Sequence, residues 1–85
     1  MSHLARLHEL PCIVCEHSAT RPQASPTVVH HLESIRDELS SYASVPLCDW
    51  HHKELHSLSR RGFEARYRLT PIDMLAMTIK LLEGK

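Results

Sequence analysis

Residues 45–56, Val-Pro-Leu-Cys-Asp-Trp-His-His-Lys-Glu-Leu-His, contain the change from strand to helix that decides the fold. The segment Ser44–Cys48 is short, apolar and partly β-branched, which predicts a strand. Pro46 places this strand at a sheet edge or near its own end. Asp49 is a good N-cap for a helix over residues 50 to about 58. The stretch therefore predicts a strand that runs directly into a helix, with metal-ligating residue types at the junction.

A second pair of ligands precedes this stretch in the chain. Cys12-x-x-Cys15 and Cys48-x-x-His51 together provide the four soft ligands that tetrahedral zinc prefers, and a site with no open position is structural. The insert between the pairs is much longer than in a two-Cys, two-His finger. Two alternatives remain: the cysteines are small core residues, or His17 is the fourth ligand instead of His51. The paired spacing favours a structural Zn²⁺ site.

Four further histidines occur in two close pairs. His52 and His56 lie four residues apart on the predicted helix, so both can bind one metal ion on the same face. His51 is rotated by about 100° from His52, so the helix can serve two metal ions on two faces. His30 and His31 lie on a predicted strand and point to opposite faces unless a turn or bulge reorients one of them.

Local patterns predict the remaining elements. The N-terminal segment Leu4–Leu10 is a short helix or an extended lead-in, and Pro11–Cys15 is expected to be a tight zinc knuckle. Further along we expect a loop over Ser18–Pro26 and a strand over Thr27–Leu32. The segment 33–41 is ambiguous, because Leu32, Ile35 and Leu39 have helical spacing but the segment is short. After the predicted helix we expect a break at Gly62 and a connector over 63–68.

The last part of the chain predicts a helix over about 70–83. Thr70 is its cap, Pro71 its first residue and Asp73 the acid at its third position, and Gly84 ends it. Met74 and Met77 are expected to be core or helix-packing residues. An apolar stripe on this helix comprises Ile72, Leu75, Ala76, Ile79 and Leu82.

Bulk composition limits the class of protein. The chain has 85 residues, which indicates a single domain over 1–85, and only 5% aromatic residues, so a metal ion is a plausible support for a small core. Lysine and arginine balance aspartate and glutamate at ten each, so DNA contacts must come from local patches. The three cysteines cannot all pair, and we find neither a membrane span nor a signal peptide. We expect a cytoplasmic protein.

These motifs together resemble a known family. The order of a His-His doublet and a Leu-Cys-x-x-His-His-x-x-x-His helix start is similar to that of the HNH (ββα-metal, His-Me finger) nucleases. The segments at 10–15, 29–32 and 45–56 resemble small phage and prophage nucleases of the Ref recombination-enhancement type. The resemblance covers about residues 5–68. It implies an α+β fold, a zinc-stabilised ββα-metal finger, to which the C-terminal helix is added.

The resemblance also implies roles for the histidines. His30, His52 and His56 would hold a catalytic divalent metal, Mg²⁺ or another ion, and His31 would be the general base. The chain departs from the family in having no asparagine between Leu32 and Cys48, where the family has one that orients the loop or the base. Ser44 or a backbone carbonyl is the candidate replacement.

Basic residues follow the predicted zinc turn. Five basic residues face two acidic ones over residues 52–68. Lys53, Arg60 and Arg61 are the predicted DNA contacts, although an ordinary solvated face has the same composition. Trp50 is expected to pack between the strands and the helix.

We therefore expect a metal-dependent DNA endonuclease or nickase. The alternatives are a non-catalytic zinc module that binds nucleic acid or protein, and an interaction protein that dimerises through the last helix. The expected partners are DNA, recombination or DNA-processing proteins and, through the stripe of the last helix, a second copy of the chain.

Overall fold

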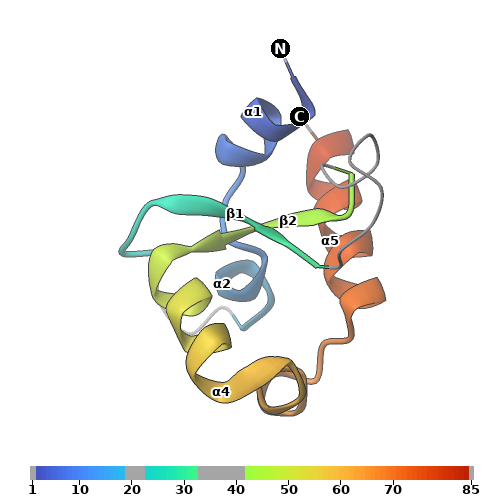
Figure 1. Ribbon diagram of the computed structural model, residues 1–85. Helices are drawn as coiled ribbons and strands as arrows, with labels where there is room; N and C mark the ends of the chain where they lie inside the picture. Colours follow the sequence, from blue (N-terminus) through green and yellow to red (C-terminus); the bar gives the residue numbers. More distant parts are fainter. Residues whose placement is uncertain (1, 19–22, 33–41, 85) are drawn as a thin grey trace.

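A computed structural model of the chain describes residues 2–18, 23–32 and 42–84. The predicted α+β class is confirmed, because helices surround a single two-stranded sheet in this part of the chain (Figure 1). The elements are α1 (His3–His8), α2 (Ile13–Ser18), β1 (Thr27–His31), β2 (Ser44–Cys48), α4 (Asp49–Tyr67) and α5 (Pro71–Glu83). The predictions for 33–41, and for part of the loop over Ser18–Pro26, lie outside the described residues.

The two strands are antiparallel, and their register runs from Thr27 opposite Cys48 to His31 opposite Ser44. The backbone hydrogen bonds that flank this ladder are Leu32 N–H to Ala43 O (2.8 Å) and Asp49 N–H to Pro26 O (2.9 Å). Hydrogen-bonded and non-hydrogen-bonded pairs alternate in an antiparallel ladder. Pro46 therefore falls at a non-hydrogen-bonded position, where its missing N–H costs no ladder bond.

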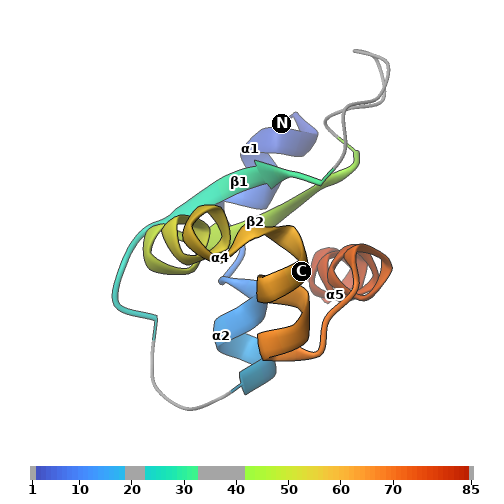
Figure 2. The ribbon, with the colours of Figure 1, turned by 60° about the horizontal axis from the view of Figure 1, so that its bottom comes forward.

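Helices cover both sides of the sheet. Figure 2 shows α1 on one side and α2 and α5 on the other. The core lies on the second side and joins both strand and helix residues: Cys12, Ile13, Val14, Val45, Leu47, Cys48, Leu55, Phe63, Leu69 and Met74. All five residues of β2 are buried, so this strand is the centre of the domain.

Helix α4 departs from our prediction at both of its ends. Cys48, and not Asp49, is its N-cap, because the Cys48 backbone is still extended and its sulfur accepts a hydrogen bond from His51 N–H. The predicted break at Gly62 and the connector over 63–68 are wrong. The kink lies at Ser59, whose φ of 70° and ψ of 165° are not helical, and the helix then continues to Tyr67.

Contacts between the two halves of α4 explain why it continues beyond the kink. The Tyr67 hydroxyl donates to the Glu54 carboxylate, and Arg66 Nε lies 3.6 Å from the other Glu54 oxygen. Ser59 Oγ also faces Gly62 N–H at 3.5 Å, so Ser59 caps the second half of the helix. The Glu54 contacts fold this second half back towards the first, which local sequence does not reveal.

Helix α5 has the predicted cap but a different buried face. Thr70 and Asp73 form a reciprocal capping box, as expected. The predicted apolar stripe does not form the core-facing side, since Ile72 is 80% exposed and Ile79 is 50% exposed. The helix instead packs through its second apolar face: Met74, Met77, Thr78 and Leu81. The helix carries two apolar stripes, and only the tertiary fold selects between them.

The segment before β1 contains one further difference. Cys12 and Cys15 do not lie on a tight knuckle, because Ile13–Ser18 form the short helix α2. Of the two alternatives for the N-terminal segment, the helix is found, as α1. Within the described ranges, none of the helices combines the length and apolar character needed to cross a membrane.

Candidate functional site

The first cluster joins three elements around the start of α4. Cys12 directly precedes α2, Cys15 lies in its first turn, Cys48 ends β2, and His51 lies in the first turn of α4. His51 Nδ1 is 3.5 Å from Cys12 Sγ, 3.5 Å from Cys15 Sγ and 3.1 Å from Cys48 Sγ. The Sγ atoms of Cys15 and Cys48 are 3.9 Å apart. The four predicted ligands therefore meet and can hold one metal ion.

The three thiols of this cluster differ in how readily they ionise. Burial raises the pKa of Cys15 to about 12, with a further contribution from the neighbouring Cys12, and burial also raises the pKa of Cys12. The pKa of Cys48 is lowered instead, because the hydrogen bond from His51 N–H stabilises its thiolate. Metal ions bind the thiolate form and compensate its charge.

A polar side chain that the sequence did not single out supports this cluster. Gln23 Oε1 accepts a hydrogen bond from Cys12 N–H at 2.8 Å, and Gln23 Nε2 donates to Thr27 Oγ1 at 2.9 Å. The Thr27 hydroxyl in turn donates to Leu10 O at 2.8 Å. Gln23 thus ties the start of α2 to the start of β1. Its position in a polar loop contains no local signal for this role.

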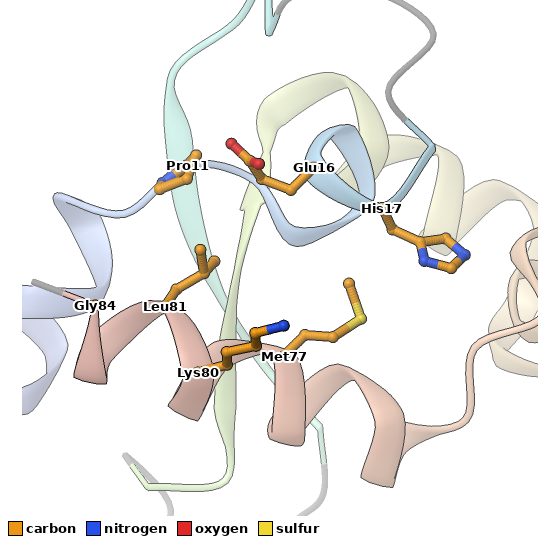
Figure 3. A pocket seen from close by; sticks show the side chains of 7 residues that line it. All are labelled: Pro11, Glu16, His17, Met77, Lys80, Leu81 and Gly84. Carbon is orange, nitrogen blue, oxygen red and sulfur yellow. The ribbon is translucent and has the colours of Figure 1, made fainter.

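His17, the alternative fourth ligand, lies elsewhere. Together with Glu16 it borders a cavity of about 460 Å³ between α2 and α5, opposite Met77 and Lys80 (Figure 3). The group of residues that can share one ion with the three cysteines contains His51 and not His17.

The second cluster consists of three imidazoles on the other side of α4. His30 projects from β1, and its ring centroid lies 5.3 Å from that of His52 and 5.8 Å from that of His56. His52 and His56 are one helical turn apart, and their Nε2 atoms are separated by 3.1 Å. These three residues can also hold one metal ion. His51 and His52 therefore serve different clusters, as their rotation around the helix predicts.

Two imidazoles of the second cluster, those of His30 and His52, have lowered pKa values. Burial, followed by the proximity of His52, His56 and His31, lowers the pKa of His30 to about 4. Burial and the neighbouring His56 also lower the pKa of His52. At neutral pH both rings are therefore uncharged, and an uncharged ring has the lone pair that a metal ligand needs.

His31 lies beside this cluster. It borders the same cavity as His30, His56 and Arg60, with a volume of about 250 Å³. Its Nδ1 atom is 2.5 Å from Ser44 Oγ on the neighbouring strand. The cavity thus combines two of the three possible metal ligands, His30 and His56, with His31, whose ring contacts a hydroxyl group, and with the guanidinium group of Arg60.

Comparison with protein families identifies the group to which these features belong. The model of the family described as recombination enhancement, RecA-dependent nuclease matches residues 2–76. The chain belongs to this family. No curated protein and no solved structure matches the chain.

For a recombination-enhancement nuclease, basic residues near the cavity are candidate DNA contacts. Arg60 borders the cavity and pairs with Glu64 at 3.4 Å, while Lys53 pairs with Asp49 at 3.0 Å. Arg61 is exposed. All three lie on α4, although the helix predicted from the sequence ended at about residue 58, and their contact with DNA stays a prediction.

Trp50 does not occupy the position that we expected. Instead of packing between the strands and the helix, its side chain is 48% exposed, and its ring meets His51 edge-on at a centroid distance of 4.9 Å. Pro46, Leu47 and Leu55 are buried near this junction, whereas Trp50 lies at the surface.

Proposed function

We propose that this member of the family is an HNH-type, metal-dependent endonuclease that hydrolyses DNA phosphodiester bonds. The observation that carries the proposal is one cavity bordered by the imidazole cluster of His30 and His56 and by His31. The succession of β1, β2 and α4, with ligands on β1 and α4, supports a ββα-metal finger. The family description supports nuclease activity.

We further propose that the cluster of Cys12, Cys15, Cys48 and His51 holds a structural Zn²⁺ ion. With Zn–S bonds of about 2.3 Å and Zn–N bonds of about 2.0 Å, tetrahedral ligands are separated by about 3.8 Å for two sulfurs and about 3.5 Å for sulfur and nitrogen. The separations of 3.9 Å and of 3.1 to 3.5 Å fit this geometry. Four protein ligands leave no open position, so the ion would join α2 to the start of α4.

The second cluster fits a divalent metal ion with open positions. Nitrogen ligands at about 2.1 Å from one ion are separated by about 3.0 to 3.4 Å, depending on the geometry. The 3.1 Å between the Nε2 atoms of His52 and His56 lies in this range. Three imidazoles accept several divalent ions, and the open positions leave room for the oxygen ligands, water and phosphate, that Mg²⁺ prefers. When bound, the ion would stabilise the negative charge that develops on the phosphate and on the leaving oxygen.

Protein side chains would supply the general base and the contacts to the phosphate backbone. His31 takes a proton from a water molecule, whose oxygen forms a bond to phosphorus while the bond from phosphorus to the leaving oxygen breaks. The leaving oxygen takes up a proton from solvent, which completes the hydrolysis. Arg60 at the edge of the cavity, with Lys53 and Arg61 along α4, would bind the phosphate backbone.

A nicking assay tests this function. The full chain, loaded with zinc, is incubated with supercoiled plasmid in the presence of Mg²⁺ or Mn²⁺. A second reaction uses single-stranded DNA, with and without RecA, because the family is described as RecA-dependent. His31→Ala should lower the rate by about 10² to 10⁴. His8→Ala is the matched control, because His8 is an exposed histidine at the end of α1. Cleavage by His31→Ala at the wild-type rate would refute the role of His31.

The same assay distinguishes a nuclease from a non-catalytic zinc module that only binds DNA. A wild-type chain that binds DNA but leaves it intact with either ion, with and without RecA, would support a non-catalytic zinc module instead.

A further inference from the structure

We propose that Ser44 is a positioning residue that holds His31 in the tautomer needed for proton abstraction. This inference rests on the proposed nuclease function, in which His31 is the base. The supporting observation is the 2.5 Å contact between His31 Nδ1 and Ser44 Oγ on the neighbouring strand.

The sheet itself fixes this contact. His31 and Ser44 are directly opposite each other in the ladder, so their side chains lie on the same face. The adjacent backbone bond from Leu32 N–H to Ala43 O makes this a non-hydrogen-bonded pair, and such pairs bring side chains closest together. The position of the hydroxyl relative to the ring is therefore set by the register of β1 and β2.

The two residues differ sharply in exposure. The Ser44 side chain is fully buried, with 0% exposure, whereas His31 is exposed and borders the cavity. A buried hydroxyl that is held by the sheet has little freedom to move. It can therefore orient a ring whose other edge is open to solvent and substrate.

The tautomer of the His31 ring decides which of its nitrogen atoms can accept a proton. A neutral imidazole carries one proton, on Nδ1 or on Nε2, and only the nitrogen without it can accept a proton from water. When Nδ1–H donates to Ser44 Oγ, the lone pair of His31 is on Nε2, the free nitrogen of the ring. The ring retains this Nδ1–H bond after Nε2 takes up the proton, so the contact serves the base both before and after proton transfer.

Selective ¹⁵N labelling of histidine provides a direct test. The full chain, loaded with zinc and Mg²⁺, is measured at pH 8, where an ordinary imidazole is neutral. Long-range ¹⁵N–¹H spectra should show His31 protonated on Nδ1. In Ser44→Ala the preference for this tautomer should decrease. A His31 ring that is protonated on Nε2 in the wild type would overturn the proposal.

Cleavage rates test the consequence. Ser44→Ala should lower kcat by about 10- to 100-fold, the usual effect of losing a partner that orients a catalytic or ligating histidine, while KM and the metal content stay unchanged. Ser44→Thr retains the hydroxyl and should restore most of the rate. Ser18→Ala is the matched control: its hydroxyl donates to Val14 O in α2, so its loss should leave the rate unchanged.

A double variant separates this inference from the proposed function. In a His31→Ala background, Ser44→Ala should cause no further loss, because it acts only through His31. If His31→Ala is impaired and Ser44→Ala retains the full rate, Ser44 has no positioning role but His31 remains the base. If His31→Ala is fully active, the proposed function itself fails. Should Ser44→Thr not fold, the tautomer in the wild-type chain still decides the role of Ser44.

Discussion

Replacing Ser59 with glycine is expected to stabilise the domain. Ser59 has a φ of 70° and a ψ of 165°, a region of backbone space that is essentially limited to glycine. The residue lies at the kink of α4 and borders the cavity of the second cluster. Glycine adopts the same backbone angles without a steric penalty, because it has no Cβ atom.

The expected gain follows from three opposing contributions. Relief of a strained backbone conformation contributes about 1 to 3 kcal/mol. The greater freedom of glycine in the unfolded chain removes about 0.5 to 1 kcal/mol of this. Loss of the long contact between Ser59 Oγ and Gly62 N–H, at 3.5 Å, removes only a few tenths, because glycine is itself accepted at an N-cap. The net gain is about 1 kcal/mol, or about 4 to 8 °C in Tm for a domain of this size.

Urea unfolding of the zinc-loaded chain at a constant free zinc concentration measures this gain. Ser57→Gly is the matched control: Ser57 is exposed and helical, two residues before the kink, so glycine there should destabilise by about 0.5 kcal/mol. Ser59→Ala keeps the strain and loses the cap, so it should destabilise by about 1 kcal/mol. Equal destabilisation by Ser57→Gly and Ser59→Gly would refute the assignment of strain to Ser59.

Two further predictions concern the metal clusters. A strong chelator should unfold the domain, because we expect metal binding at the cysteine cluster to contribute folding free energy. Cys12→Ser should have the same effect. His56→Ala should keep the fold and retain one of the two metal ions. Full helical circular dichroism in a metal-free chain would contradict this. For the zinc-loaded chain without a second metal, the free energy of unfolding should decrease as the pH falls from about 6.5 to about 4. Unfolded His30 binds a proton in that range, whereas folded His30, with its pKa lowered to about 4, does not. His30→Gln should lessen this dependence, and an identical pH profile for variant and wild type would show that His30 does not cause it.

Much of the candidate site could be predicted from local sequence. Spacings of three and four residues on a helix determine which side chains share a face, so the separation of His51 from His52 and the pairing of His52 with His56 followed from α-helical geometry alone. The cap of α5 was equally local, because the hydroxyl of Thr70 and the carboxylate of Asp73 bond only to nearby backbone. Such features depend on chain geometry over a single turn.

The tertiary structure decided what depends on distant partners. The buried face of α5 is that of Met74 rather than that of Ile79, because the helix carries two apolar stripes and the sheet selects one. The kink at Ser59 depends on the second half of α4 folding back towards Glu54.

The contact between His31 and Ser44 depends on strand register. The sequence could name Ser44 only as one of two candidates to replace the missing asparagine. A shift of one residue between β1 and β2 would turn the hydroxyl to the opposite face from His31. The sequence by itself therefore determined the ligand sets and the helix faces that they share, because these depend on neighbouring residues. Only the tertiary structure decided which side chains from separate elements touch, because that depends on how the elements pack.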